Sequence, residues 1–195
     1  MSFSKKAIKE FIFLTRIKLT RKVAIGSGEV IQKGWFSTDI DSLNLTNEKD
    51  FYKYWKPNTL KGFFAEHVWE HLTLKEGIEA SQNCYKFLRK GGFLRIAVPD
   101  GLHPDREYID CVKPCGTGNG SDDHKVLYTY KSLGAVLKKA GFRIEFLEYW
   151  DENKKFHFKK WDINKGLVRR SMFYDWRNSE GQLKYTSIII DAIKD

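Results

Sequence analysis

The chain of 195 residues contains only three cysteines, Cys84, Cys111 and Cys115, and no C-x-x-C pair. An odd number at these spacings argues against a disulfide framework and against a four-cysteine zinc site. No apolar run approaches the roughly 18 residues that span a bilayer. The short FIFL run near the N-terminus is not followed by a small-residue cleavage site. We therefore expect a cytoplasmic protein without a transmembrane segment.

Hydrophobic residues make up 42% of the sequence and aromatic residues 15%, which is enough for one sizeable core. The sequence has no internal repeat and no low-complexity tract, so we expect residues 1–195 to form a single domain. The chain has 34 Lys and Arg against 25 Asp and Glu, a formal net charge of +9. Such a surface attracts polyanions, including nucleic acid, anionic lipid and phosphorylated substrates, and charge alone does not choose among them.

Two segments combine basic and apolar side chains. Residues 1–20 have an approximate helical stripe that predicts a basic N-terminal helix packed on the core, although binding to a membrane or to nucleic acid stays open. Residues 151–184 interleave Arg and Lys with Phe, Trp and Tyr. This pattern predicts a long β-hairpin arm, with turns at INKG and NSEG, that packs aromatic rings over a sheet. The same composition can bind phosphates and stack bases, so a substrate contact by Arg169, Arg170 or Arg177 stays open.

Between these segments, short apolar runs alternate with helical stretches. Strands are expected at 22–26, 35–40, 42–45, 62–66 and 92–98, and again at 143–150 and 185–193. Helices are expected over 73–92 and over 130–142, where Gly141 ends the second one. This alternation predicts an α/β fold with an open, mostly parallel sheet and helices on both faces.

Ligands of such sheets bind beyond the carboxyl ends of the strands, and three features of the sequence lie there. Gly26 and Gly28 follow the first strand and would let the backbone approach a ligand closely. Asp39 ends the second strand, where a carboxylate can accept hydrogen bonds from both hydroxyls of a ribose or can cap a turn. The third feature is the stretch AEHVWEHL, Ala65 to Leu72, which follows the strand at 62–66.

This last stretch also contains H-x-x-E-H, His67 to His71, an inverted zinc-peptidase signature. A zinc hydrolase would need a third ligand on a following helix, and the acids at the right distance, Glu145 and Glu148, lie in an expected strand. A metal bound by His67, His71, His103 and His124 is a further alternative, since imidazoles suit zinc. We favour neither and predict no metal ligand.

Taken together, these motifs resemble the class I S-adenosylmethionine-dependent methyltransferases, in a short, methyltransferase type 11-like branch. The resemblance covers residues 22–150 and is carried by KVAIGSGE, GWFSTDID, FFAEHVWEHL, FLRKGGFLRIAVPDG and AGFRIEFLEYW. It implies a Rossmann-like sheet with an antiparallel last strand and S-adenosylmethionine as the cofactor. It also implies that the E-H-V-x-E-H-L run lies beside the cofactor without a metal. The implied cofactor-binding residues are Gly26, Ser27, Gly28, Asp39, Ala65, Glu66 and His67.

The sequence departs from that family at two places. Only six residues separate Gly28 from WFSTD, which is too few for the helix that normally joins the first two strands. Asn44 stands where many relatives carry an acid. A non-catalytic module that keeps the fold and binds nucleic acid or an anionic surface is therefore the alternative to an enzyme, and a zinc-dependent hydrolase is the third hypothesis.

Methyl transfer needs an acceptor held in line with the methyl group, and an oxygen or nitrogen acceptor often needs a base. The acceptor, whether a small molecule or a macromolecule, is not identified by the sequence. The loops over 99–128 are long and polar, as substrate-binding loops often are. They supply the candidate catalytic residues His124, His103 and Asp100, each of which can instead belong to an ordinary turn or helix start.

Overall fold

The computed structural model describes residues 21–28, 32–179 and 181–195. Its strands form one seven-stranded sheet in the order β2-β1-β3-β4-β7-β5-β6. Their bounds are β1 (Lys22–Ile25), β2 (Phe36–Ser37), β3 (Leu60–Glu66), β4 (Leu88–Pro99), β5 (Arg143–Trp150), β6 (Phe156–Phe158) and β7 (Ser187–Ile193). The four strands from β2 to β4 are parallel, whereas β7 runs antiparallel to both β4 and β5. The expected mixed sheet with an antiparallel last strand is confirmed.

The helices of the described residues are short apart from two. Their bounds are α2 (Glu48–Tyr52), α3 (Leu74–Phe87), α4 (Arg106–Val112) and α5 (Tyr130–Lys139), with 3-10 turns η1 (Trp69–His71), η2 (Ser121–Asp123) and η3 (Ile163–Lys165). Both long helices begin with a capping box, at Thr73 and at Thr129, in which side chains satisfy the free amides of the first turn. None of the described helices is long and apolar enough to cross a membrane.

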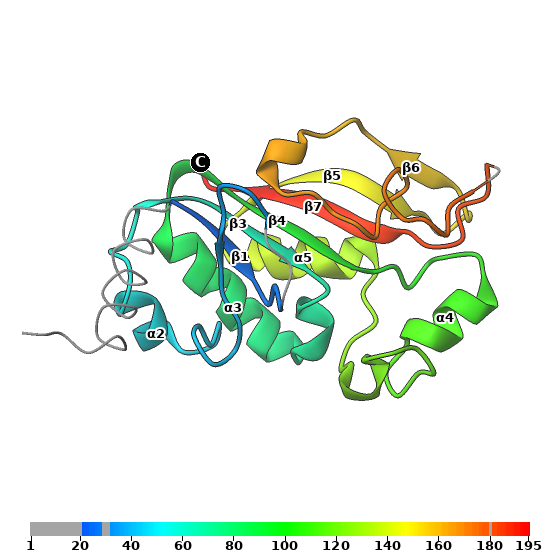
Figure 1. Cartoon of the computed structure of the whole chain (residues 1–195), viewed down its shortest axis with the longest axis horizontal. Helices are drawn as coiled ribbons and strands as arrows, with labels where there is room; N and C mark the ends of the chain where they lie inside the picture. Colours follow the sequence, from blue (N-terminus) through cyan, green and yellow to red (C-terminus); the bar gives the residue numbers. More distant parts are fainter. Residues whose placement is uncertain (1–20, 29–31, 180) are drawn as a thin grey trace, which may run out of the picture.

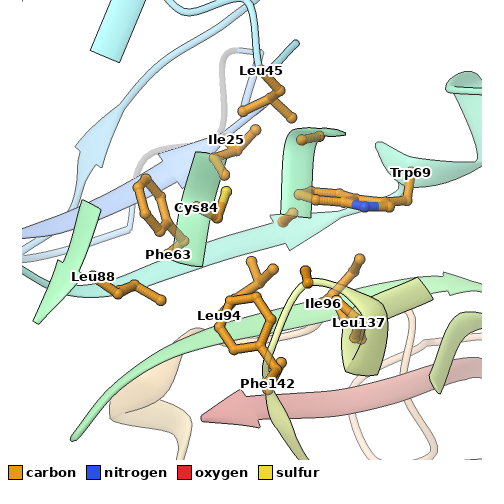
Figure 2. Close-up of a cluster of buried hydrophobic side chains, with 14 of the residues drawn as sticks. Ile25, Leu45, Phe63, Trp69, Cys84, Leu88, Leu94, Ile96, Leu137 and Phe142 are labelled. Carbon is orange, nitrogen blue, oxygen red and sulfur yellow. The ribbon is translucent and has the colours of Figure 1, made fainter. Parts of the chain in front are cut away.

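One face of the sheet is covered by α2, α3 and α5, which lie side by side below the strands in Figure 1. Side chains from these helices and from alternate positions of the strands form the main core, part of which is drawn in Figure 2. Trp69, Cys84 and Phe63 are fully buried there. Each large side chain buried in this way stabilises the fold by about 1.5–3 kcal/mol. The core therefore fixes the positions of β1 and β3, whose carboxyl ends border the cleft described below.

The opposite face is covered differently from the sequence prediction. A smaller apolar cluster, which includes Phe64, Leu147 and Val168, packs there against Trp161. The segment that covers this face, residues 159–172 around η3, contains no α-helix and is called the covering segment below. Figure 1 shows this segment on the side of the sheet away from α3 and α5. The expectation of helices on both faces thus holds, in the part of the chain that the structure describes, for one face only.

A buried ion pair attaches this covering segment to the sheet. Arg95 on β4 and Asp191 on β7 are both 2% exposed or less, and Arg95 Nε lies 2.7 Å from Asp191 Oδ1. The same guanidinium donates to the carbonyl oxygens of Asp162 and Gly166, and it lies 4.9 Å from the centre of the Trp161 ring. The Arg95 side chain thereby provides hydrogen bonds to two backbone carbonyl groups of the covering segment that are not paired in the sheet.

Three local predictions are wrong or untestable. Residues 42–45 form turns rather than a strand, because the Asn44 side chain accepts hydrogen bonds from the amide and hydroxyl of Thr46. The long hairpin expected over 151–184 reduces to β6 and η3, with turns and loops elsewhere among the described residues. The basic helix expected over 1–20 lies outside the described residues. Between β1 and β2 the described residues contain no helix, as the short connection requires.

Candidate active site

A cleft of about 1190 Å³ opens beyond the carboxyl ends of β1 and β3. Its first wall is the sheet edge, with the Gly26–Gly28 turn, Glu66 and His67. Its second wall comes from the loops after β4, around α4 and η2, and from residues 167–185. Pockets that bind one small molecule typically have volumes of about 300–1,000 Å³, so this cleft has room for more than one small ligand.

The glycine turn after β1 has the conformation that the sequence predicts. Gly26 and Gly28 have φ of +55° and +51°, a region that favours glycine. A Cβ atom at Gly26 would lie 2.6 Å from Cγ2 of Val68, so this position has no room for a side chain. Ser27 donates its amide to the Thr38 carbonyl, which ties the turn to the end of β2.

Asp39 lies beside this turn, just beyond β2. Its Oδ2 accepts a hydrogen bond from the Gly28 amide at 3.2 Å, and its Oδ1 accepts one from the Ile40 amide. The residue is exposed. An anionic oxygen pair is thus held at the outer end of the glycine turn, where it can accept further hydrogen bonds from a ligand.

At the end of β3, Ala65 is fully buried and the next two side chains reach the cleft. Glu66 Oε1 accepts the Arg170 amide at 2.8 Å, and burial raises the pKa of this carboxyl. His67 has φ of +56°, an uncommon backbone conformation for a residue with a side chain. Its Nε2 lies 3.0 Å from Ser187 Oγ, and burial holds its pKa well below the ordinary value, so the ring is neutral.

Glu70, in the η1 turn, is 1% exposed. Neither carboxylate oxygen accepts a hydrogen bond within the described residues. His67 Nδ1 lies 3.2 Å from its Oε1, but without hydrogen-bond geometry. Burial raises the pKa of Glu70 to about 8. The hydroxyl of Tyr128 is likewise buried with no hydrogen-bond partner among the residues that the structure describes, and burial raises its pKa to about 12.

Of the three catalytic candidates, His124 alone lines the cleft. It stands edge-on to His71, with ring centres 4.7 Å apart, because the Glu70 carbonyl accepts the amides of Lys125 and Val126 and draws this loop to η1. His124 Nδ1 lies 2.7 Å from the Val112 carbonyl oxygen, and burial lowers the pKa of the ring.

Asp100 and His103 lie away from the cleft and hold the fold. Asp100 is fully buried, accepts the amides of Leu102 and Trp150, and has its pKa raised by burial to about 6. His103 is 2% exposed and stacks on Tyr108 with ring centres 4.0 Å apart. Both of its ring nitrogens are engaged, by the Asp105 amide and the Leu183 carbonyl, and burial lowers its pKa to about 4. Neither side chain lines the cleft, although the sequence suggests both as catalytic residues.

The segment over 167–185 brings all three arginines that the sequence singles out to the cleft: Arg169, Arg170 and Arg177. Arg177 forms an ion pair with Asp175 and lies 3.4 Å from the centre of the Tyr185 ring. Tyr185 and the 87% exposed Trp176 also line the cleft, and no sequence motif marks them. Glu70 belongs to the H-x-x-E-H motif, but among the hypotheses from the sequence only the zinc hydrolase gives it a role.

Neither a protein-family model nor a curated protein sequence matches the chain. Solved structures do. A SAM-dependent methyltransferase from Archaeoglobus fulgidus matches 97% of this chain and 94% of its own, with a TM-score of 0.50 at 18% sequence identity. A structure from Thermotoga maritima, described as a SAM-dependent methyltransferase and possible histamine N-methyltransferase, matches 99% and 96%, with a TM-score of 0.52 at 14% identity. The chain therefore has the Rossmann-like fold of the class I methyltransferases.

Proposed function

We propose that the protein binds S-adenosylmethionine and transfers its methyl group to an acceptor held in the same cleft. One observation carries the proposal: the Gly26–Gly28 turn lines a cleft of about 1190 Å³, and the exposed Asp39 carboxylate accepts the Gly28 amide and so lies beside that turn. Backbone without side chains beside an exposed carboxylate suits a nucleoside, whose ribose hydroxyls donate to the acid.

The first wall of the cleft would hold the cofactor. Gly26, Ser27 and Gly28 offer their backbone, and Asp39 would accept from the ribose. The strand end formed by Ala65, Glu66 and His67 would lie alongside. Asn44 uses its side-chain oxygen within its own turn, so we assign it no contact with the cofactor.

The second wall would hold the acceptor. S-adenosylmethionine would supply an electrophilic methyl group, and its sulfonium sulfur would keep the bonding electron pair as the methyl carbon bonded to an acceptor oxygen or nitrogen. That atom loses its proton to a base or to solvent, and positioning contributes most of the rate. Of the predicted catalytic residues we retain His124, because it lines this half of the cleft. Arg169 and Arg170, both exposed there, suit an acceptor that carries an anionic group.

Calorimetric titration with S-adenosylmethionine and S-adenosylhomocysteine tests the cofactor site. We expect micromolar binding of both, and Asp39→Ala should weaken it by about 1–3 kcal/mol because a charged hydrogen-bond partner is removed. Asp41→Ala, which removes an exposed carboxylate two residues away, is the matched control and should bind as the unaltered chain does. Equal binding by Asp39→Ala would show that Asp39 does not hold the ribose.

Absence of cofactor binding by the unaltered chain would overturn the proposal. The chain would then be a methyltransferase fold used for binding alone. In that case its basic surface predicts association with nucleic acid or anionic vesicles that weakens steeply as salt is raised.

A further inference from the structure

Three potential metal ligands meet where the two walls of the cleft join. Ligand atoms of Glu70, His71 and His124 all lie within 4.8 Å of one another. Glu70 and His71 belong to η1, directly after β3, and His124 follows η2. The hydrogen bonds from Lys125 and Val126 to the Glu70 carbonyl hold the two segments together. The cluster is therefore part of the folded framework and does not depend on mobile side chains at a surface.

The carboxylate of this cluster lacks the partners that a buried acid normally has. Glu70 is 1% exposed, and neither of its oxygens accepts a hydrogen bond from any described residue. An unpartnered buried carboxylate costs several kcal/mol, so native structures usually supply a partner. Here the nearby His67, His71 and His124 present ring nitrogens, which a cation could bridge to the carboxylate.

In both histidines, Nδ1 faces a hydrogen-bond acceptor. His124 Nδ1 faces the Val112 carbonyl oxygen at 2.7 Å, so it carries the proton and donates. His71 Nδ1 faces the Asp123 carboxylate in the same way. In both rings this leaves the lone pair on Nε2. A ligating histidine almost always donates its other N–H to a carboxylate or a backbone carbonyl, and these two have one partner of each kind.

We propose that Glu70, His71 and His124 bind a divalent transition-metal ion, with zinc as the best-suited metal. Two imidazoles and one carboxylate are the ligands of open catalytic zinc sites, which keep a coordination position for water or substrate. Because His71 and His124 line the cleft, the open position faces the acceptor half. This assignment departs from the sequence prediction of no metal, and it gives His124 the role of a ligand in place of a base.

If the proposed methyl transfer holds, on which this step alone rests, the ion would bind an oxygen of the acceptor. A hydroxyl bound to zinc loses its proton to solvent far more readily than a free one, and the ion would also fix its orientation. The acceptor class would then be a hydroxylated compound. Metal binding itself does not depend on the cofactor and can be measured without it.

The test is titration of the metal-free 195-residue chain with Zn²⁺ by calorimetry and with Co²⁺ by absorption spectroscopy. Cys111, which is partly buried, and Cys115, which is exposed, are replaced by serine throughout, so that their thiols do not bind the metals. We expect one ion per chain and a Co²⁺ spectrum of nitrogen and oxygen ligands. His71→Ala, His124→Ala and Glu70→Gln should each weaken binding at least about tenfold, and Asp123→Asn, which removes the partner of His71, about tenfold.

His157→Ala is the matched control, because His157 pairs with Asp151 on the β5–β6 hairpin and is outside the cleft. It should bind Zn²⁺ as the parent does. Circular dichroism checks that each variant is folded, and Asp123→Asn, at an exposed side chain, keeps the test valid if a buried variant does not fold. The proposal fails if the parent binds no stoichiometric Zn²⁺, or if the ligand variants bind it unchanged. S-adenosylhomocysteine titrated into the metal-free chain judges the cofactor site separately.

Discussion

His103 and His124 both lie in the loops over 99–128 and yet have unrelated roles in the structure. Both stand in polar loops after the fourth central strand, and both are flanked by acids. His124 reaches the cleft, whereas His103 contacts the Leu183 carbonyl, 80 residues further along the chain. No local pattern contains that contact. The sequence therefore predicts a pair of candidates but cannot say which of them faces a ligand.

The burial of His103 makes a prediction about pH. Its pKa falls from 6.5 to about 4 on folding, so the unfolded chain binds more protons between these values. The stability that neutral His103 contributes is full above pH 6.5 and is lost as the pH falls through 4. His103→Gln should be less stable than the parent at pH 7, and this difference should shrink as the pH is lowered. Urea unfolding of both chains from pH 7 to pH 4.5 measures it.

Asp100, in the same loop, should give stability the opposite dependence on pH, and Asp100→Asn tests this. Burial raises the pKa of Asp100 from 3.8 to about 6, so the folded chain binds more protons between these values. Its contribution to stability is present below pH 3.8 and is lost as the pH rises through 6. The stability of the parent relative to Asp100→Asn should therefore increase on acidification. A difference independent of pH for either variant would contradict the assigned environment.

At the scale of elements, the sequence predicts best where the contacts are local. The strand at 143–150 coincides with β5, and α5 begins and ends within the expected range. The segment at 42–45 misleads because Leu43 and Leu45 are buried alternately, as in a strand, while the Asn44 side chain holds the backbone in a turn. The covering segment around η3 could not be predicted, since its backbone is held by Arg95 and Glu148 from distant strands.

The Arg95–Asp191 pair predicts how this covering segment can be detached. Arg95→Met removes the donors to Asp162 and Gly166 and leaves Asp191 buried beside Lys165 alone. Breaking one partner of a buried pair costs about 3–5 kcal/mol, and we expect a loss of that size in urea unfolding. Trypsin should then cleave faster at the exposed Lys159 and Lys160.

Two further variants separate the buried pair from its surroundings. Adding Asp191→Asn to Arg95→Met removes the unpaired charge, so the double variant should be less destabilised than the sum of the two single changes. Lys165→Met removes only a half-buried partner of Asp191 and should cost about 1 kcal/mol or less. Additive losses, or an unchanged rate of cleavage in Arg95→Met, would show that the pair does not hold the segment.

At the scale of the whole molecule, the positive charge is concentrated in two segments. Residues 1–20 contain five Lys or Arg against one Glu, and residues 151–184 contain nine against five acids. The part of the second segment from Leu167 onward forms part of one wall of the cleft, so its charge would act on the proposed acceptor as well as on the surface. The net charge of +9 is thus compatible with an anionic acceptor and does not by itself require a polyanionic partner.

The sequence also predicts one domain, and two of the three cysteines allow that to be measured. Cys84, on α3, is fully buried in the main core (Figure 2), whereas Cys115 is exposed. Burial raises the pKa of the Cys84 thiol far above its ordinary value, so it cannot react while α3 is packed on the sheet. If the described core unfolds as one unit, alkylation of Cys84 in increasing urea should have the same midpoint as the loss of circular dichroism. Cys115 should react at every urea concentration and serves as the internal control. Labelling of Cys84 at a lower urea concentration would show that α3 opens locally and that the chain does not unfold as a single domain.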